Sequence, residues 1–86
     1  MFEIEVHSNA LKHGLTKEEV VFAWENFVRR QHRELPNGDQ IIAVGFDMHG
    51  NSIELIAVSK SFGVLIYHAM TPPTEKILKE LGIARR

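Results

Sequence analysis

At 86 residues the chain is long enough for a single domain, 1–86, whose one hydrophobic core is only just large enough to be stable. Its 10 Lys and Arg against 11 Asp and Glu leave a net charge of −1, so RNA binding would need a local basic cluster rather than bulk charge. The absence of cysteine excludes disulfides and thiolate metal sites, and no apolar run approaches the ~20 residues of a membrane span. The acidic start lacks the features of a signal peptide, so we expect a cytoplasmic location.

The first predicted elements are short. Residues 2–6 alternate between apolar and polar side chains, which predicts a half-buried strand. Ser8 or Asn9 can then cap a brief helix that ends near Lys12 and His13, because the glycine after them is a natural helix stop.

A stronger helix start follows this glycine. Thr16 and Glu19 have the spacing of a capping box. We expect the main helix to run from Lys17 to about Gln31, because apolar side chains recur along one face. The members of this stripe are Val20, Val21, Trp24, Phe27 and Val28. Phe22 lies on the opposite face, where it is either an incidental exposed aromatic or a contact with a partner.

The only basic cluster of the chain lies at the end of this predicted helix. It contains Arg29, Arg30 and Arg33, with His32 among them. Positive charge at a helix C-terminus complements the helix dipole, which is a sufficient structural reason for the cluster. The alternative is an edge that contacts RNA phosphates, and the sequence leaves both interpretations open.

Three strands with short connections follow and predict an antiparallel meander. They comprise residues 40–47, 52–59 and 64–70. Thr71 is expected to cap the last helix, with Pro72 at its first position and an apolar face formed by Ile77, Leu78 and Leu81. The predicted order is β-α-α-β-β-β-α, an α+β fold with an antiparallel three- to four-stranded sheet and the main helix on one face.

Both faces of the predicted strands carry apolar side chains. In the first strand of the meander, Ile42 and Val44 lie on one face and Ile41 and Ala43 on the other. Either the two helices cover opposite faces, or a second chain covers the apolar surface that remains, in a homodimer or in a complex with another protein.

His68 is the one imidazole on the last predicted strand. Strict alternation puts it on the same face as Val64, Ile66 and Met70. It is therefore either a hydrogen-bonded structural group or a general acid/base. Tyr67 points to the other face, where it can stack on an RNA base if that face is open.

The sequence shows no other chemical motif. Its five histidines lack the paired spacing of metal ligands, so we expect no metal site. There is also no glycine-rich phosphate loop and no serine nucleophile motif, and no cofactor is expected.

Two parts of the chain carry motifs of a known kind. Lys12-His13-Gly14-Leu15-Thr16, followed by Glu19, resembles the KHG-[IV]-[ST] opening of BrnT-like toxins, which belong to the RelE superfamily. The later segments Gly45-Phe46-Asp47-Met48-His49-Gly50-Asn51, Glu54-Leu55 and Ile66-Tyr67-His68-Ala69-Met70 are similar to small actinobacterial-type toxin-family proteins, whose closing strand reads [VI]-x-H-A-M. The resemblance covers the chain from about Val6 to Leu81.

This resemblance implies a compact sheet flanked by helices, a ribonuclease activity that blocks translation, and neutralisation by an antitoxin protein. Lys12, His13, Glu54 and His68 stand at the matching motif positions. In this interpretation His68 is the acid/base, Glu54 is a base or orienting group, and Lys12 acts on the RNA phosphate. The predicted RNA contacts are His13, Arg29, Arg30, Arg33 and Tyr67.

One departure from the family pattern keeps a second hypothesis open. Family members place arginines just after the closing strand, but residues 71–76 contain none. The alternative function is a non-catalytic binding module that homodimerises or binds a partner protein through an apolar sheet face.

Overall fold

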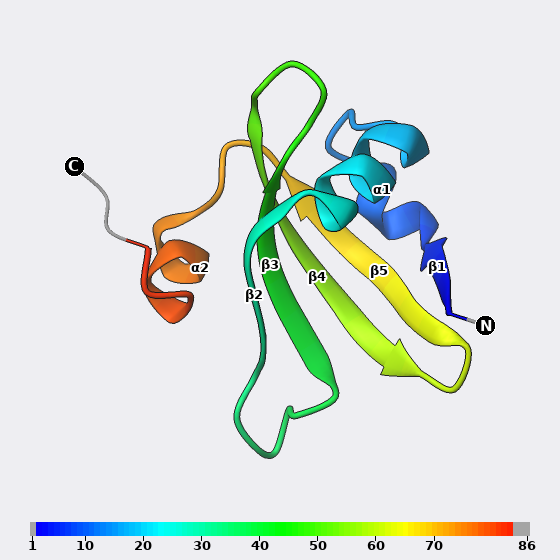
Figure 1. Ribbon diagram of the computed structural model, residues 1–86, viewed down its shortest axis with the longest axis vertical. Helices are drawn as coiled ribbons and strands as arrows, with labels where there is room; N and C mark the ends of the chain where they lie inside the picture. Colours follow the sequence, from blue (N-terminus) through cyan, green and yellow to red (C-terminus); the bar gives the residue numbers. More distant parts are fainter. Residues whose placement is uncertain (1, 84–86) are drawn as a thin grey trace.

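The computed structural model describes residues 2–83, which form one five-stranded sheet with helices on both sides (Figure 1). The elements are β1 (Glu3–Val6), the 3₁₀ turn η1 (Ser8–Leu11), α1 (Lys17–Glu25), β2 (Phe27–His32), β3 (Gln40–Phe46), β4 (Ser52–Lys60), β5 (Gly63–Met70) and α2 (Glu75–Glu80). The strand order is β1-β5-β4-β3-β2, in which β1 is parallel to β5 and all other neighbours are antiparallel. The α+β class and the three hairpin-linked strands are confirmed.

The largest difference from the predicted fold is strand β2. The sequence predicts one helix to about Gln31, whereas α1 ends at Glu25 and the chain then pairs with β3. Gly45 on β3 lets the end of α1 lie directly against this strand, since a Cβ atom at this position would lie 1.9 Å from the carbonyl oxygen of Ala23. The chain continues along the open edge of β3, where backbone pairing outweighs the helical spacing of Phe27 and Val28.

Three smaller predictions also change. The sheet is mixed rather than antiparallel, because β1 pairs in parallel with β5, and the order is β-η-α-β-β-β-β-α. The first short helix is a 3₁₀ turn. The cap of α2 is Thr74 rather than Thr71, whose hydroxyl instead donates to the carbonyl of Ser52 at 2.6 Å. By contrast the capping box of Thr16 and Glu19 at the start of α1 is confirmed.

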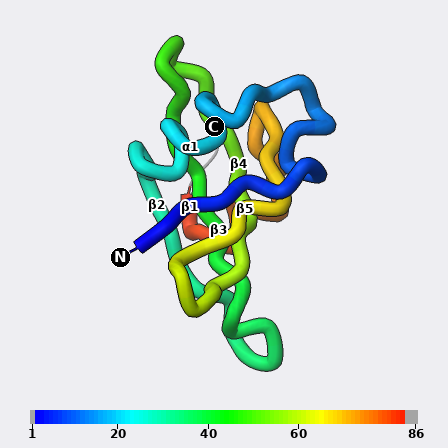
Figure 2. The backbone as a smooth tube through the Cα atoms, turned by 90° about the vertical axis from the view of Figure 1, so that its right-hand side faces the viewer, coloured from blue at the N-terminus to red at the C-terminus, as the bar shows by residue number. Residues whose placement is uncertain are grey.

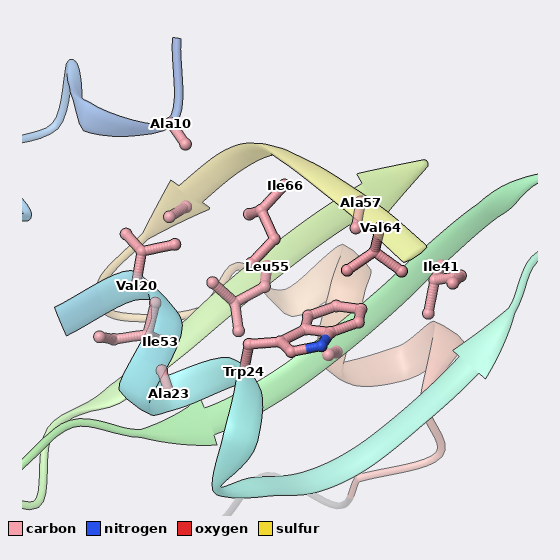
Figure 3. Packing of buried hydrophobic residues seen from close by; sticks show 12 residues of the cluster. Ala10, Val20, Ala23, Trp24, Ile41, Ile53, Leu55, Ala57, Val64 and Ile66 are labelled. Carbon is pink, nitrogen blue, oxygen red and sulfur yellow. The ribbon is translucent and has the colours of Figure 1, made fainter. Parts of the chain in front are cut away.

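The two faces of the sheet carry separate hydrophobic layers. Trp24 and Val20 of α1 pack over Leu55 and Ile66 in the larger layer (Figure 3). On the other face the smaller layer unites α2 with β3, and its buried members are Ile42, Val44, Ile77 and Leu81. The helices therefore cover opposite faces, as one of the two sequence-based alternatives requires. No helix within residues 2–83 has the length and apolar character needed to cross a membrane.

A β-bulge in β5 moves His68 to a different face from the one that alternation predicts. Ile66 pairs with Ala57 and His68 pairs with Ile56, so Tyr67 is an extra residue between the two pairs. Ile66 belongs to the layer under α1, whereas Ile56 packs in the layer under α2. Since directly paired residues share a face, His68 lies on the α2 face, and its predicted position beside Val64 and Ile66 is wrong.

The outer edge of β5 is closed in two parts. β1 runs alongside β5 only as far as the pair Val6 and Ile66 (Figure 2). Beyond it the chain turns into η1, where the His7 amide donates to the carbonyl of Ile66 and the Asn9 side chain donates to that of Tyr67, both at 2.8 Å. The η1 turn therefore follows the bulged end of β5, next to His68.

Candidate functional site

The candidate site forms where β5 and β4 meet the start of α2. Glu54 and Ile56 lie on the same face of β4, and His68 pairs with Ile56. Long side chains reach diagonal neighbours across a sheet. The imidazole Nε2 of His68 accordingly lies 2.7 Å from the Oε2 of Glu54. Two of the three predicted catalytic residues, His68 and Glu54, are therefore in direct contact.

The carboxylate of Glu54 is buried and fully hydrogen-bonded. Only 4% of its side chain is exposed. Its Oε1 accepts one hydrogen bond from the backbone N–H of Thr74 at 2.7 Å and another from the Thr74 hydroxyl at 2.8 Å. Burial of a charged group is costly unless it is paired and hydrogen-bonded, so these contacts hold the carboxylate in one orientation.

His68 combines a fixed position with access to solvent. With Glu54 ionised, its oxygens can only accept, which assigns the proton to the Nε2 that faces it and leaves Nδ1 as the free base of a neutral ring. The side chain is 21% exposed. His68 thus has the hydrogen bond that a structural histidine requires and the accessibility that an acid/base requires.

A second imidazole lies beside the first. The ring centroids of His13 and His68 are 5.9 Å apart, and the two rings meet edge to face at 77°. His13 is exposed and follows Lys12, the C-cap residue of η1, which is also exposed. The Lys12-His13 motif therefore reaches the pair of Glu54 and His68 through the ring of His13.

The predicted RNA-binding arginines do not form a single cluster. Arg29 of β2 and Arg33, which directly follows this strand, both contact the end of α2: Arg29 donates to the carbonyl of Leu81 at 3.1 Å, and Arg33 pairs with Glu80 at 3.0 Å. Arg30 instead lies with its guanidinium over the rings of Trp24 and Phe27. Because α1 ends before them, the helix-dipole explanation of these arginines is wrong, and their RNA contact stays a prediction.

Tyr67 and Phe22 are the two other predicted contact residues. Tyr67 is half-buried in the bulge, next to His68 in the chain. Phe22 is half-buried on α1, in a shallow depression of about 370 Å³ that Val21 and Glu25 also line. Its role as a partner contact stays a prediction.

Sequence analysis missed Thr74, the residue that links Glu54 to α2. The signal was present, because Thr74 precedes Glu75 and the apolar face of α2 in the manner of an N-cap. Thr71 before Pro72 carries an equivalent signal three residues earlier, and local chemistry cannot choose between the two.

Asp47 is a second buried carboxylate that sequence analysis did not single out. Its Oδ1 accepts from the backbone N–H groups of His49 and Asn51, both at 2.8 Å, and these bonds close the turn between β3 and β4. Burial acts to raise the pKa of the Asp47 carboxyl, but the hydrogen bonds from Asn51 and His49 outweigh it and hold the pKa below its ordinary value. Asp47 therefore has a structural role in this turn.

Across residues 2–83, no three His, Asp or Glu side chains are grouped so that they could hold a metal ion. The chain matches no protein-family model, no curated protein and no solved structure. The chemistry of the site therefore has to be argued from its own geometry.

Proposed function

We propose that this protein is a metal-independent endoribonuclease of the RelE/BrnT-like toxin type, with His68 at its catalytic centre. One observation carries the proposal: the buried carboxylate of Glu54 anchors Nε2 of His68 at 2.7 Å, while the ring stays 21% exposed beside His13. An imidazole held at one nitrogen by a carboxylate has a defined tautomer and a free base at the other nitrogen.

Cleavage of RNA without a metal requires two proton transfers. Nδ1 of His68 takes the proton of the 2′-hydroxyl while the 2′-oxygen bonds to phosphorus. Protonated His13 gives its proton to the 5′-oxygen as the bond between that oxygen and phosphorus breaks. The products are a 2′,3′-cyclic phosphate and a 5′-hydroxyl, and the carboxylate of Glu54 stabilises the imidazolium formed on His68.

Lys12 is the cation best suited to contact the phosphate. It is exposed and directly precedes His13, whose ring meets that of His68. The absence of arginine from residues 71–76 removes the phosphate contacts that the family pattern supplies there. We therefore expect weak RNA binding and slow cleavage compared with a site that has an arginine clamp.

The test is cleavage of a fluorescently labelled single-stranded RNA by the purified protein in the presence of EDTA. The wild type should produce 2′,3′-cyclic phosphate ends. His68→Asn should lower the rate by about 100-fold or more, the range typical of a lost general acid/base. His49→Asn is the matched control, because His49 is an exposed histidine in the turn between β3 and β4. It should cleave at the wild-type rate.

Two results would contradict the proposal. One is the absence of cleavage above the level of a mock preparation. The other is equal cleavage by His68→Asn and wild type, with circular dichroism showing that both are folded, since His68 would then be a structural histidine.

A second candidate function is non-catalytic self-association, and a separate observation favours it. Phe27, Val28, Phe46 and Met48 are each at least 44% exposed, although they are large apolar residues. Of these four, Val28 and Phe46 lie close together, because both line the same groove. This apolar groove has a volume of about 240 Å³, and other apolar side chains line it as well.

The proposed occupant of this groove is a second copy of the chain, because a net charge of −1 produces little repulsion between copies. Sedimentation velocity over a wide concentration range should then show a dimer that Phe46→Ser weakens. A monomer at every concentration would exclude this candidate without affecting the ribonuclease proposal.

A further inference from the structure

The contacts of Thr74 connect the start of α2 to the buried carboxylate of Glu54 on β4. Its hydroxyl donates to Oε1 of Glu54 at 2.8 Å and also accepts from the backbone N–H of Ile77 at 3.4 Å. Its own backbone N–H donates to the same Oε1 at 2.7 Å. One residue therefore caps α2 and directs two hydrogen bonds at one oxygen of the buried carboxylate.

These two donors determine which oxygen of Glu54 is available to His68. Oε1 faces the N–H and O–H of Thr74, so Oε2 is left to face Nε2 of His68. The side chain of Glu54 is 4% exposed, and water is therefore a poor substitute for either contact. The orientation of the Glu54 carboxylate is thus set by Thr74, the N-cap residue of α2.

We propose that Thr74 is a positioning residue, which acts through Glu54 to hold His68 in the tautomer with a proton on Nε2 and a free Nδ1. The role in catalysis rests on the proposed ribonuclease function, whereas the effect on the tautomer does not. Thr74 itself need not touch RNA.

Replacement of Glu54 by glutamine should change which nitrogen of His68 carries the ring proton. The amide of Glu54→Gln has one oxygen, which accepts, and one NH₂ group, which donates. Two donors of Thr74 face one position of this side chain, so the amide oxygen must lie there to avoid unsatisfied buried donors. The NH₂ group then points at Nε2 of His68, which must accept, and the ring proton moves to Nδ1.

The experiment is long-range ¹H–¹⁵N NMR of the histidine rings, which distinguishes protonated from bare ring nitrogens. Spectra are recorded at about pH 8.5, above the ordinary imidazole pKa of about 6.5, so that neutral rings dominate. His68 should carry its proton on Nε2 in the wild type and on Nδ1 in Glu54→Gln. A His68 that keeps its proton on Nε2 in Glu54→Gln would overturn the proposal.

Variants of Thr74 separate positioning from helix capping. Thr74→Ser keeps the hydroxyl and should keep the wild-type tautomer. Thr74→Asp keeps a good cap for α2 but replaces the hydroxyl donor with a second carboxylate that faces Oε1 of Glu54. Repulsion between the two carboxylates should turn Glu54 away from Nε2 of His68, and His68, without its acceptor, should show a mixture of tautomers in a folded protein. If Thr74→Asp is folded and has the wild-type tautomer, the hydroxyl has no positioning role.

Glu80→Gln is the matched control, because it loosens the other end of α2 without touching Glu54. Glu80 binds Arg33 at 3.0 Å, and its loss should leave the His68 tautomer unchanged. A tautomer change in Glu80→Gln would mean that any loosening of α2 affects the ring, which would contradict a specific role for Thr74.

The activity measurement distinguishes this inference from the proposed function. If wild type cleaves RNA, Thr74→Asp should lower kcat by about 10-fold with little change in KM, because it disturbs the base rather than RNA binding. If wild type does not cleave RNA but the tautomer changes as stated, the ribonuclease proposal fails and the positioning role of Thr74 stands.

Discussion

Two carboxylates hold α2 to the sheet, and they differ in burial. At the start of α2, Glu54 is 4% exposed and accepts hydrogen bonds from Thr74 and His68. At its end, Glu80 is 31% exposed and binds Arg33 through two hydrogen bonds of 3.1 and 3.0 Å. Both carboxylates accept hydrogen bonds at both oxygens, but only Glu54 contacts a titratable ring, that of His68, whose side chain is 21% exposed.

Ion-pair geometry alone does not identify a functional site, because the effect of a pair depends on its burial. The side chains of Arg33 and Glu80 are 20% and 31% exposed, so the contribution of this pair to stability is small. At Glu54 the exclusion of water makes each hydrogen bond obligatory. The position of His68 is therefore specified by a network that the fold cannot easily rearrange.

The largest effect is expected at the buried end. Glu54→Ala removes three hydrogen-bond acceptor contacts and leaves both donors of Thr74 unpaired, which should lower the free energy of unfolding by about 3 kcal/mol. Urea denaturation at neutral pH measures this change. If the free energy of unfolding falls by no more than it does when an exposed ion pair is lost, water can replace the carboxylate as the hydrogen-bond partner of Thr74 and His68, which would contradict this expectation.

Asp47 provides an intermediate case, because it is a buried carboxylate whose hydrogen-bond donors are backbone and amide N–H groups rather than a histidine ring. Its pKa is lowered by the hydrogen bonds from Asn51 and His49, so the ionised form stabilises the folded state. This stability is present above the unfolded pKa of about 3.9 and is lost as pH falls through the lower folded pKa.

The corresponding variant is Asp47→Asn, which cannot ionise. Thermal denaturation at a series of pH values should show that wild type loses more stability than Asp47→Asn between neutral pH and pH about 3, the region below the ordinary carboxyl pKa. Parallel curves for the two proteins would mean that the pKa of Asp47 is not lowered by folding.

The smallest effect is expected at the exposed end of α2. Glu80→Gln should cost about 0.5 kcal/mol, because exposed ion pairs contribute little. The difference from wild type should decrease further in 1 M NaCl, since salt screens exposed charges. A loss comparable to that of Glu54→Ala would remove the distinction between the two ends of α2.

The sequence predicts those elements whose local pattern agrees with the tertiary contacts. The capping box of Thr16 and Glu19 and the three hairpin-linked strands are confirmed, because short-range alternation and turn residues decide them. Strand β2 was missed because the spacing of Trp24, Phe27 and Val28 fits a helix. The open edge of β3, which favours strand pairing over the helix, is not a local property.

The candidate site could be predicted in part. The motif resemblance grouped Glu54 with His68, and these two residues are in contact. The face of His68 could not be predicted, because the bulge at Tyr67 is a feature of pairing between two strands rather than of either strand alone. Thr74 escaped prediction because the cap signal is repeated at Thr71.

Whether His68 and His13 form one RNA site can be tested by NMR titration of the histidine rings with an RNA oligonucleotide whose 2′-hydroxyls are replaced by fluorine, which cannot be cleaved by this route. The ring signals of His68 and His13 should shift together on binding, while those of His32 and His49 stay in place. Shifts confined to the strand of Arg29 and Arg30, or no shift of His68 at saturating RNA, would contradict a shared RNA site.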